Sequence, residues 1–150
     1  SSTNNSSASS PVTSGQEDHS LGDMVRFVAQ QLYAPERLLT QPNWIYRVPM
    51  HMDHFIPFYR GDVVSAMPLA SWRAGDYYIS AILLRNVLDQ TVNLRYDLIR
   101  GQWIAASFFR QGSLSPFILT PAKSESDTTT VIVVSSVPLS AALQTGVGHE

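Results

Sequence analysis

The protein has 150 residues, of which 44% are hydrophobic and 15% charged, with no cysteine and a formal net charge of -2. The length predicts one domain, and the missing cysteines exclude a disulfide scaffold, a zinc ribbon and a cysteine nucleophile. The ten basic residues are spread without a cluster that could follow a phosphate backbone, which argues against nucleic-acid binding.

The first segment is rich in serine and threonine. Ser1 to Gln16 hold nine Ser or Thr residues and no charge, so they have almost nothing to bury. We therefore predict a flexible linker over residues 1–18. Because the chain begins at Ser1 without a methionine, we expect it to be a piece of a longer protein.

A helix is predicted next. Ser20 can cap its first turn, and Pro35 cannot continue it, so we expect the helix to end near Tyr33. Pro35 then suits the first position of a short helical turn to Leu39. The apolar stripe that should dock this helix on the domain recurs at helical spacing, at Leu21, Met24, Val25, Val28 and Leu32.

After Thr40, short β-branched and aromatic runs are separated by turn signals, a pattern typical of a β-sandwich or barrel. The domain is expected to span residues 19–143, with a flexible tail over 144–150. The prolines are expected to fall near strand ends. The predicted strands are Trp44 to Val48, Asp62 to Met67, Tyr77 to Leu88, Thr91 to Tyr96, Trp103 to Arg110 and Thr129 to Ser136.

Two of these strands are expected in the middle of a sheet. The strand from Tyr77 is partly apolar in both of its alternating sets of residues, which predicts cover on both faces. The run from Val131 to Val134 is uncharged and β-branched, so as a bare edge it would invite another strand. We expect it to be paired on both sides within the sheet. Strand addition by a partner chain is the alternative.

Eight aromatic residues gather in two stretches, from Trp44 to Tyr59 and from Trp72 to Tyr78. The charged fraction of 15% is below the roughly 25% of an average soluble protein, so some apolar surface is expected to meet a partner. Each single aromatic is expected to fill the core, but the group is expected to leave some rings exposed. The partner-binding residues predicted from these stretches are Trp44, Tyr46, Phe58, Tyr59, Trp72 and Tyr77.

No catalytic residue, metal or cofactor is predicted. His51, Asp53 and His54 are the right ligand types for zinc or iron, but we interpret them as a solvated loop. A metal-dependent hydrolase at these residues remains an alternative. A second alternative is a periplasmic glycan- or peptidoglycan-binding module that uses Trp44, Tyr46, Trp72 and Tyr77. No G-x-S-x-G elbow or glycine-rich phosphate loop is present.

Several longer motifs resemble a protein family that is encoded on bacterial integrating conjugative elements. The likeness covers about residues 21–143, and none of its motifs is catalytic. The motifs that carry it are Phe27-Val-Ala-Gln-Gln-Leu-Tyr-Ala-Pro35, Pro68-Leu-Ala-Ser-Trp-Arg-Ala-Gly75, Leu84-Arg-Asn-Val87, Val92-Asn-Leu-Arg95, Asp97-Leu-Ile-Arg-Gly101, Trp103-Ile-Ala-Ala106, Asp127-Thr-Thr-Thr130 and Ala141-Ala-Leu143.

That family is similar in architecture to the C-terminal part of the TraK-type component of conjugative type IV secretion systems. The resemblance implies a periplasmic protein of the outer-membrane core complex, active in horizontal gene transfer. Its expected partners are a small outer-membrane lipoprotein and a TraB-type channel subunit, in an assembly that is expected to form an oligomeric ring. Together with the residue pattern, it predicts a mainly β, Ig-like β-sandwich preceded by one amphipathic helix and a flexible linker.

Overall fold

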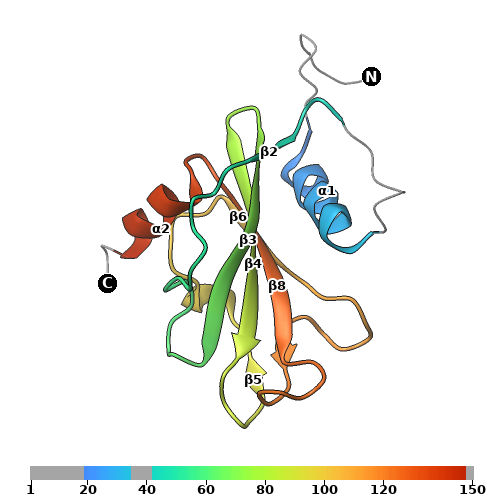
Figure 1. Cartoon of the computed structure of the whole chain (residues 1–150), viewed down its shortest axis with the longest axis vertical. Helices are drawn as coiled ribbons and strands as arrows, with labels where there is room; N and C mark the ends of the chain where they lie inside the picture. Colours follow the sequence, from blue (N-terminus) through green and yellow to red (C-terminus); the bar gives the residue numbers. More distant parts are fainter. Residues whose placement is uncertain (1–18, 35–41, 148–150) are drawn as a thin grey trace, which may run out of the picture.

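The computed structural model of the protein describes residues 19–34 and 42–147 (Figure 1). A five-stranded antiparallel sheet with the order β2-β3-β4-β8-β6 forms its centre, and a second sheet pairs β5 with β7. The elements are α1 (Leu21–Tyr33), β2 (Tyr46–Val48), β3 (Val64–Ala74), β4 (Tyr77–Asn86), β5 (Val92–Asn93), the 3-10 helix η3 (Tyr96–Leu98), β6 (Ala105–Phe109), β7 (Ile118–Leu119), β8 (Thr128–Ser135) and α2 (Leu139–Val147).

The predicted class is confirmed, because the fold is mainly β and sandwich-like with one helix before the sheet. Three predicted features lie outside the described residues: the linker over 1–18, the turn from Pro35 to Leu39, and positions 148–150 of the expected tail. Among the residues that the structure describes, no helix combines the length and the apolar character needed to cross a membrane.

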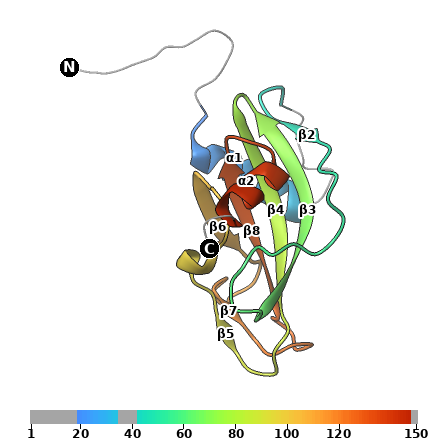
Figure 2. The same cartoon turned by 90° about the vertical axis from the view of Figure 1, so that its left-hand side faces the viewer.

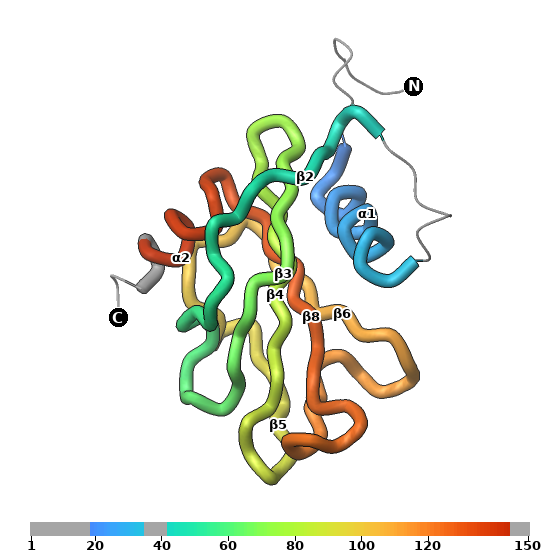
Figure 3. The backbone as a smooth tube through the Cα atoms, viewed as in Figure 1, coloured from blue at the N-terminus to red at the C-terminus, as the bar shows by residue number. Residues whose placement is uncertain are grey.

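The two faces of the large sheet carry separate cores. On one face, Met24, Val25 and Val28 of α1 pack against a buried set that includes Ile79 and Ile132. The other face is covered by the chain from Met50 to Tyr59, by the β5–β7 sheet and by α2. The two helices accordingly lie on opposite sides of the strands (Figures 1, 2 and 3). Since successive side chains of a strand point to opposite faces, β8 supplies both cores in alternation.

The two central strands are where the sequence predicts them. β4 pairs with β3 on one side and β8 on the other, and β8 lies between β4 and β6. All four residues from Val131 to Val134 are buried. Their uncharged run is therefore enclosed on both edges by strands of the same chain, as we expected.

β3 is longer than predicted, because Pro68 lies inside it and does not end it. The N–H of Ile56 donates to the carbonyl oxygen of Ala66 (3.0 Å), so the backbone of Ala66 faces away from β4. Pro68, two residues further on, faces the same way, and its missing N–H removes no bond from the β3–β4 ladder. A bulge follows at once, between Pro68 and Ala70. The prediction of a strand end at Met67 is wrong for this reason.

Helix α1 begins and ends where its sequence signals predict. The hydroxyl of Ser20 accepts from the N–H of Asp23 (3.1 Å), and the Asp23 carboxylate accepts from the N–H of Ser20 (3.1 Å). That backbone bond, together with a bond from Arg26 (2.9 Å), holds the pKa of Asp23 below its usual value. The helix ends at Tyr33, before Pro35.

We predict that Ser20→Ala lowers the free energy of unfolding by about 1 kcal/mol, because the N–H of Asp23 then loses its acceptor at the helix start. Urea unfolding followed by circular dichroism measures the effect. Ser20→Asp, which keeps a capping oxygen, is the matched control and should cost less than half as much. Equal losses in the two variants would contradict the capping role.

The C-terminal helix α2 and the strand β7 were not expected from the sequence. α2 begins after Pro138, whose carbonyl oxygen accepts from the N–H of Ala142 (3.0 Å). A helix of nine residues is marginal alone, and here Leu139 and Leu143 are buried in the core beneath it. Tertiary packing thus continues ordered structure beyond position 143, where the sequence suggested that the domain ends.

Candidate protein-docking surface

The edge strand β2 brings aromatic and cationic side chains together. Its register pairs Tyr46 with Arg73 of β3, and Arg73 in turn pairs with Tyr78 of β4, so the three lie in one row across the sheet. The Arg73 guanidinium lies over the Tyr78 ring, 5.0 Å from its centroid. Its Nε donates to the carbonyl oxygen of Gly75 (3.1 Å). The row is therefore a preformed polar and aromatic surface at the sheet edge.

A groove of about 350 Å³ lies over this row. One wall is the chain that follows β2, where Met50 and Met52 are half-buried. The opposite wall is the start of α2, with Pro138 and Leu139. Methionine side chains adapt to different contact partners, which makes such a lining suitable for a protein ligand.

The chain after β2 has a second hollow along it, of about 720 Å³, between this chain and Ala70 of β3. β2 pairs with β3 only as far as Ser71. Next to this hollow in sequence, Phe55 is 64% exposed, and at the other end of the same segment Tyr46 is 55% exposed. We call residues 46–55 the edge segment.

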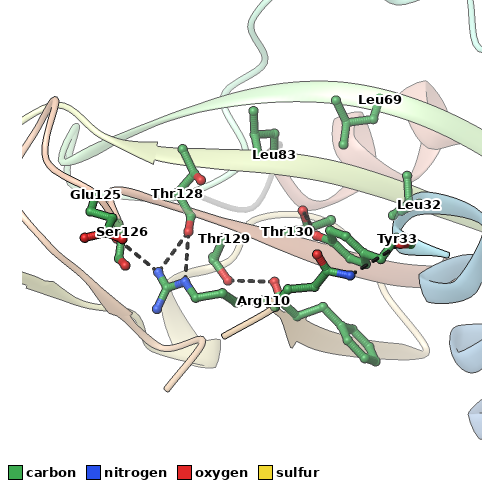
Figure 4. Close-up of a pocket in the computed structure, with 12 residues that line it drawn as sticks. Leu32, Tyr33, Leu69, Leu83, Arg110, Glu125, Ser126, Thr128, Thr129 and Thr130 are labelled. Carbon is green, nitrogen blue, oxygen red and sulfur yellow. Dashed lines mark hydrogen bonds between the residues drawn. The ribbon is translucent and has the colours of Figure 1, made fainter. Parts of the chain in front are cut away.

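A different hollow, of about 370 Å³, lies between the end of α1 and β8 (Figure 4). The Tyr33 hydroxyl donates to the Thr130 hydroxyl (2.6 Å) at its α1 end. Arg110 donates to three backbone carbonyl oxygens, those of Ser115, Ser126 and Thr128. Burial lowers the pKa of this guanidinium. Because its donors are taken up by the backbone, Arg110 acts as a clamp between loop and strand.

Residues 1–148 of the chain match DUF3438, a family described as a protein of unknown function. The chain belongs to this family. A comparison with curated proteins finds no match. The family match extends from the serine-rich start through α2, so the edge segment, its groove and the hollow beside α1 all lie within the family's common region.

Three of the six predicted partner-binding aromatics belong to the core of this DUF3438 domain. Phe58 has no exposed surface and lies beside Trp103, with 5.7 Å between the ring centroids. Tyr59 is buried, which raises its pKa, and its hydroxyl accepts from the N–H of Arg95 (2.8 Å). Trp72 is buried under α1. These three side chains therefore present almost no surface to a partner in this structure, because they fill the two cores of the sheet.

The other three predicted aromatics are only partly available. Trp44 is half-buried and stacks on His19, with ring centroids 3.7 Å apart, so it fastens the start of α1. Tyr77 is half-buried against the same core. Only Tyr46 is exposed. The structure therefore does not join Trp44, Tyr46, Trp72 and Tyr77 into one exposed platform of the kind that the glycan-binding alternative requires.

The histidine cluster of the edge segment does not converge. His51 has a positive φ of 59° and lines the groove. Nδ1 of His54 lies 3.8 Å from the nearer carboxylate oxygen of Asp53, and both side chains are strongly exposed. Within residues 19–34 and 42–147, no three His, Cys, Asp or Glu side chains form a group that could hold a metal ion.

Sequence reasoning missed Phe55 and the two methionines as surface residues. The available signal was an apolar composition inside a proline-bounded loop, between Pro49 and Pro57. Apolar side chains in a loop either fold back on the core or face a partner. Met50 and Met52 pack in part against the core, and Phe55 is exposed on the surface.

Proposed function

We propose that this domain is a non-catalytic assembly module of a conjugative type IV secretion apparatus encoded on an integrating conjugative element. In this proposal it works in the periplasm of a Gram-negative bacterium, next to the outer membrane. Its partners there are other core-complex subunits, namely a small outer-membrane lipoprotein and a TraB-type channel subunit. The resemblance of the motifs from Phe27 to Leu143 to the family encoded on such elements is the reason for proposing this apparatus.

One observation carries the proposal for this chain: the edge segment exposes Tyr46 and Phe55 at the margin of the sheet. Large aromatic side chains are enriched in protein interfaces, where they contribute much of the binding energy. Two hollows lie along the segment and can receive side chains of a partner. A low charged fraction supports the same reading, since interface centres are depleted of charge.

The test is copurification of the lipoprotein and the TraB-type subunit of the same element with the tagged full chain. We predict that both are recovered, and that the double variant Tyr46→Ser with Phe55→Ser lowers recovery at least about tenfold, because two exposed anchors are lost. The matched control removes equally exposed apolar groups elsewhere, by Val87→Ser with Ile104→Ser. This control should bind as the unmodified chain does.

Recovery of neither subunit by the unmodified chain would contradict the assembly role. Equal loss in the test and control variants would remove the edge segment from the interface. Titration with peptidoglycan fragments, followed by tryptophan fluorescence, belongs in the same series. Saturable quenching without subunit capture would favour the glycan-binding alternative.

A further inference from the structure

The groove over β2 is positively charged. Its lining contains Arg73 and His51, and no acidic side chain among the described residues contributes to it. Arg73 is half-buried, and within this part of the chain its guanidinium forms no ion pair. Only its Nε has a hydrogen bond, to Gly75, which leaves the terminal nitrogens for a ligand. A carboxylate is the group whose geometry and charge match a guanidinium.

The opposite wall of the groove, formed by the start of α2, also favours a carboxylate. α2 begins at Leu139, and its first backbone bond runs from the N–H of Ala142 to the oxygen of Pro138. The start of a helix carries a partial positive charge. Arg73 on the sheet and the start of α2 therefore face the same groove with the same sign of charge.

The groove also has a strand beside it with a free edge. β2 is the first strand in the sheet order, so within the described residues only β3 is its neighbour. Tyr46 and Val48, which alternate along β2, both line the groove. A segment added in extended form next to β2 would send every second side chain toward the same groove.

We propose that this groove binds an extended, acidic segment of a partner subunit, which lies along β2. An apolar side chain of the segment packs between Tyr46 and Met50, and a carboxylate two residues away pairs with Arg73. The inference rests on the proposed function for the identity of the partner, but the recognition chemistry belongs to the groove and can be measured without the partner.

The test uses the full chain and a synthetic nine-residue peptide, blocked at both ends, with valine at positions 1, 5 and 9, glutamate at positions 3 and 7, and threonine at the even positions, so that valine and glutamate share one face of the extended peptide. Nitrogen-15 chemical shifts of the backbone amides report where the peptide binds. We expect saturable shifts at residues 46–48, 50, 71–78 and 139–140. The same peptide with glutamine in place of glutamate should bind at least about tenfold more weakly, because it cannot form the charged pair.

Variants of the chain separate charge from folding. Arg73→Glu should weaken peptide binding at least about tenfold, and Arg73→Lys should keep part of it, because a point charge replaces the fork of donors. Arg95→Glu changes the net charge equally at an exposed residue outside the groove, and should bind as the unmodified chain does. Dispersed amide spectra establish that each variant is folded, and Arg73→Gln serves if the glutamate variant is not.

Equal binding of the glutamate and glutamine peptides would overturn the proposal. So would shifts outside the groove, or unchanged affinity in a folded Arg73 variant. These outcomes can be distinguished from a failure of the proposed secretion function. Subunit capture without peptide binding would reject the acidic-segment groove alone, and peptide binding without subunit capture would reject the secretion partners alone.

Discussion

Replacing Asn86 by alanine is expected to lower the free energy of unfolding by about 3 kcal/mol or more. Asn86 is 1% exposed, at the end of β4. Its Nδ2 donates to the carbonyl oxygens of Gln90 (2.8 Å) and Thr120 (2.9 Å), with Leu119 at 3.4 Å. Its Oδ1 accepts from the N–H of Leu88 (2.8 Å).

The physical reason is that one side chain satisfies backbone groups from two distant segments. Asn86 joins the turn after β4 to the end of β7, so alanine would leave an N–H and two or more carbonyl oxygens without protein partners. A buried polar group that loses its partner costs about 1–3 kcal/mol. A water that entered the space would recover only part of this.

Urea unfolding followed by tryptophan fluorescence measures the loss. The matched control is Asn93→Ala, since Asn93 is an exposed asparagine on β5 and its replacement should stay within about 0.5 kcal/mol. Asn86→Asp keeps the acceptor for Leu88 but loses the donors, and should also be strongly destabilised. A loss at Asn86 no larger than that at Asn93 would contradict the network.

Gly101→Ala is expected to cost about 3 kcal/mol, from backbone strain and a steric clash together. Gly101 has a φ of 113°, which side-chain-bearing residues rarely adopt. An added Cβ would lie 2.5 Å from Cζ2 of Trp103. The indole cannot simply move away, because its N–H donates to the carbonyl oxygen of Arg100 (2.6 Å) and its ring packs beside Phe58.

A second glycine, Gly75, separates the cost of backbone strain from the cost of the steric clash. Gly75, between β3 and β4, has a φ of 60°, but an added Cβ would meet nothing within 4 Å. Gly75→Ala should therefore cost only the strain, about 1–2 kcal/mol. Thermal or urea unfolding of the two variants gives the difference directly. Equal losses would mean that Trp103 yields freely and that the close approach has no energetic consequence.

The features predicted well from the sequence are those set by neighbouring residues. The bounds of α1 follow from Ser20, the apolar stripe and Pro35, all within one short segment. Gly75 and Gly101, which lie between strands, have positive φ angles of 60° and 113°. The carboxylate of Asp127, just before β8, accepts from the N–H of Lys123 (3.0 Å), another contact between residues close in the chain.

The candidate site was predicted only in part, because exposure is not a local property. Tyr46 and Trp72 are both aromatic residues near β2, yet one is exposed and the other lies under α1. Nothing near either residue in the sequence distinguishes them. The register of β2 on β3 sends Tyr46 to the α2 face and Trp72 to the α1 face.

By itself, the sequence determined a mainly β domain with a capped leading helix and two central strands. It also showed many aromatic side chains and few charged ones. Only the tertiary structure decided which aromatics remain outside, that Pro68 sits within β3, and that a short α2 forms one wall of a groove. The physical reason is the same in each case. Hydrogen-bond direction, burial and helix stability here depend on contacts between segments far apart in the chain, such as β2 with β3 and α2 with the sheet.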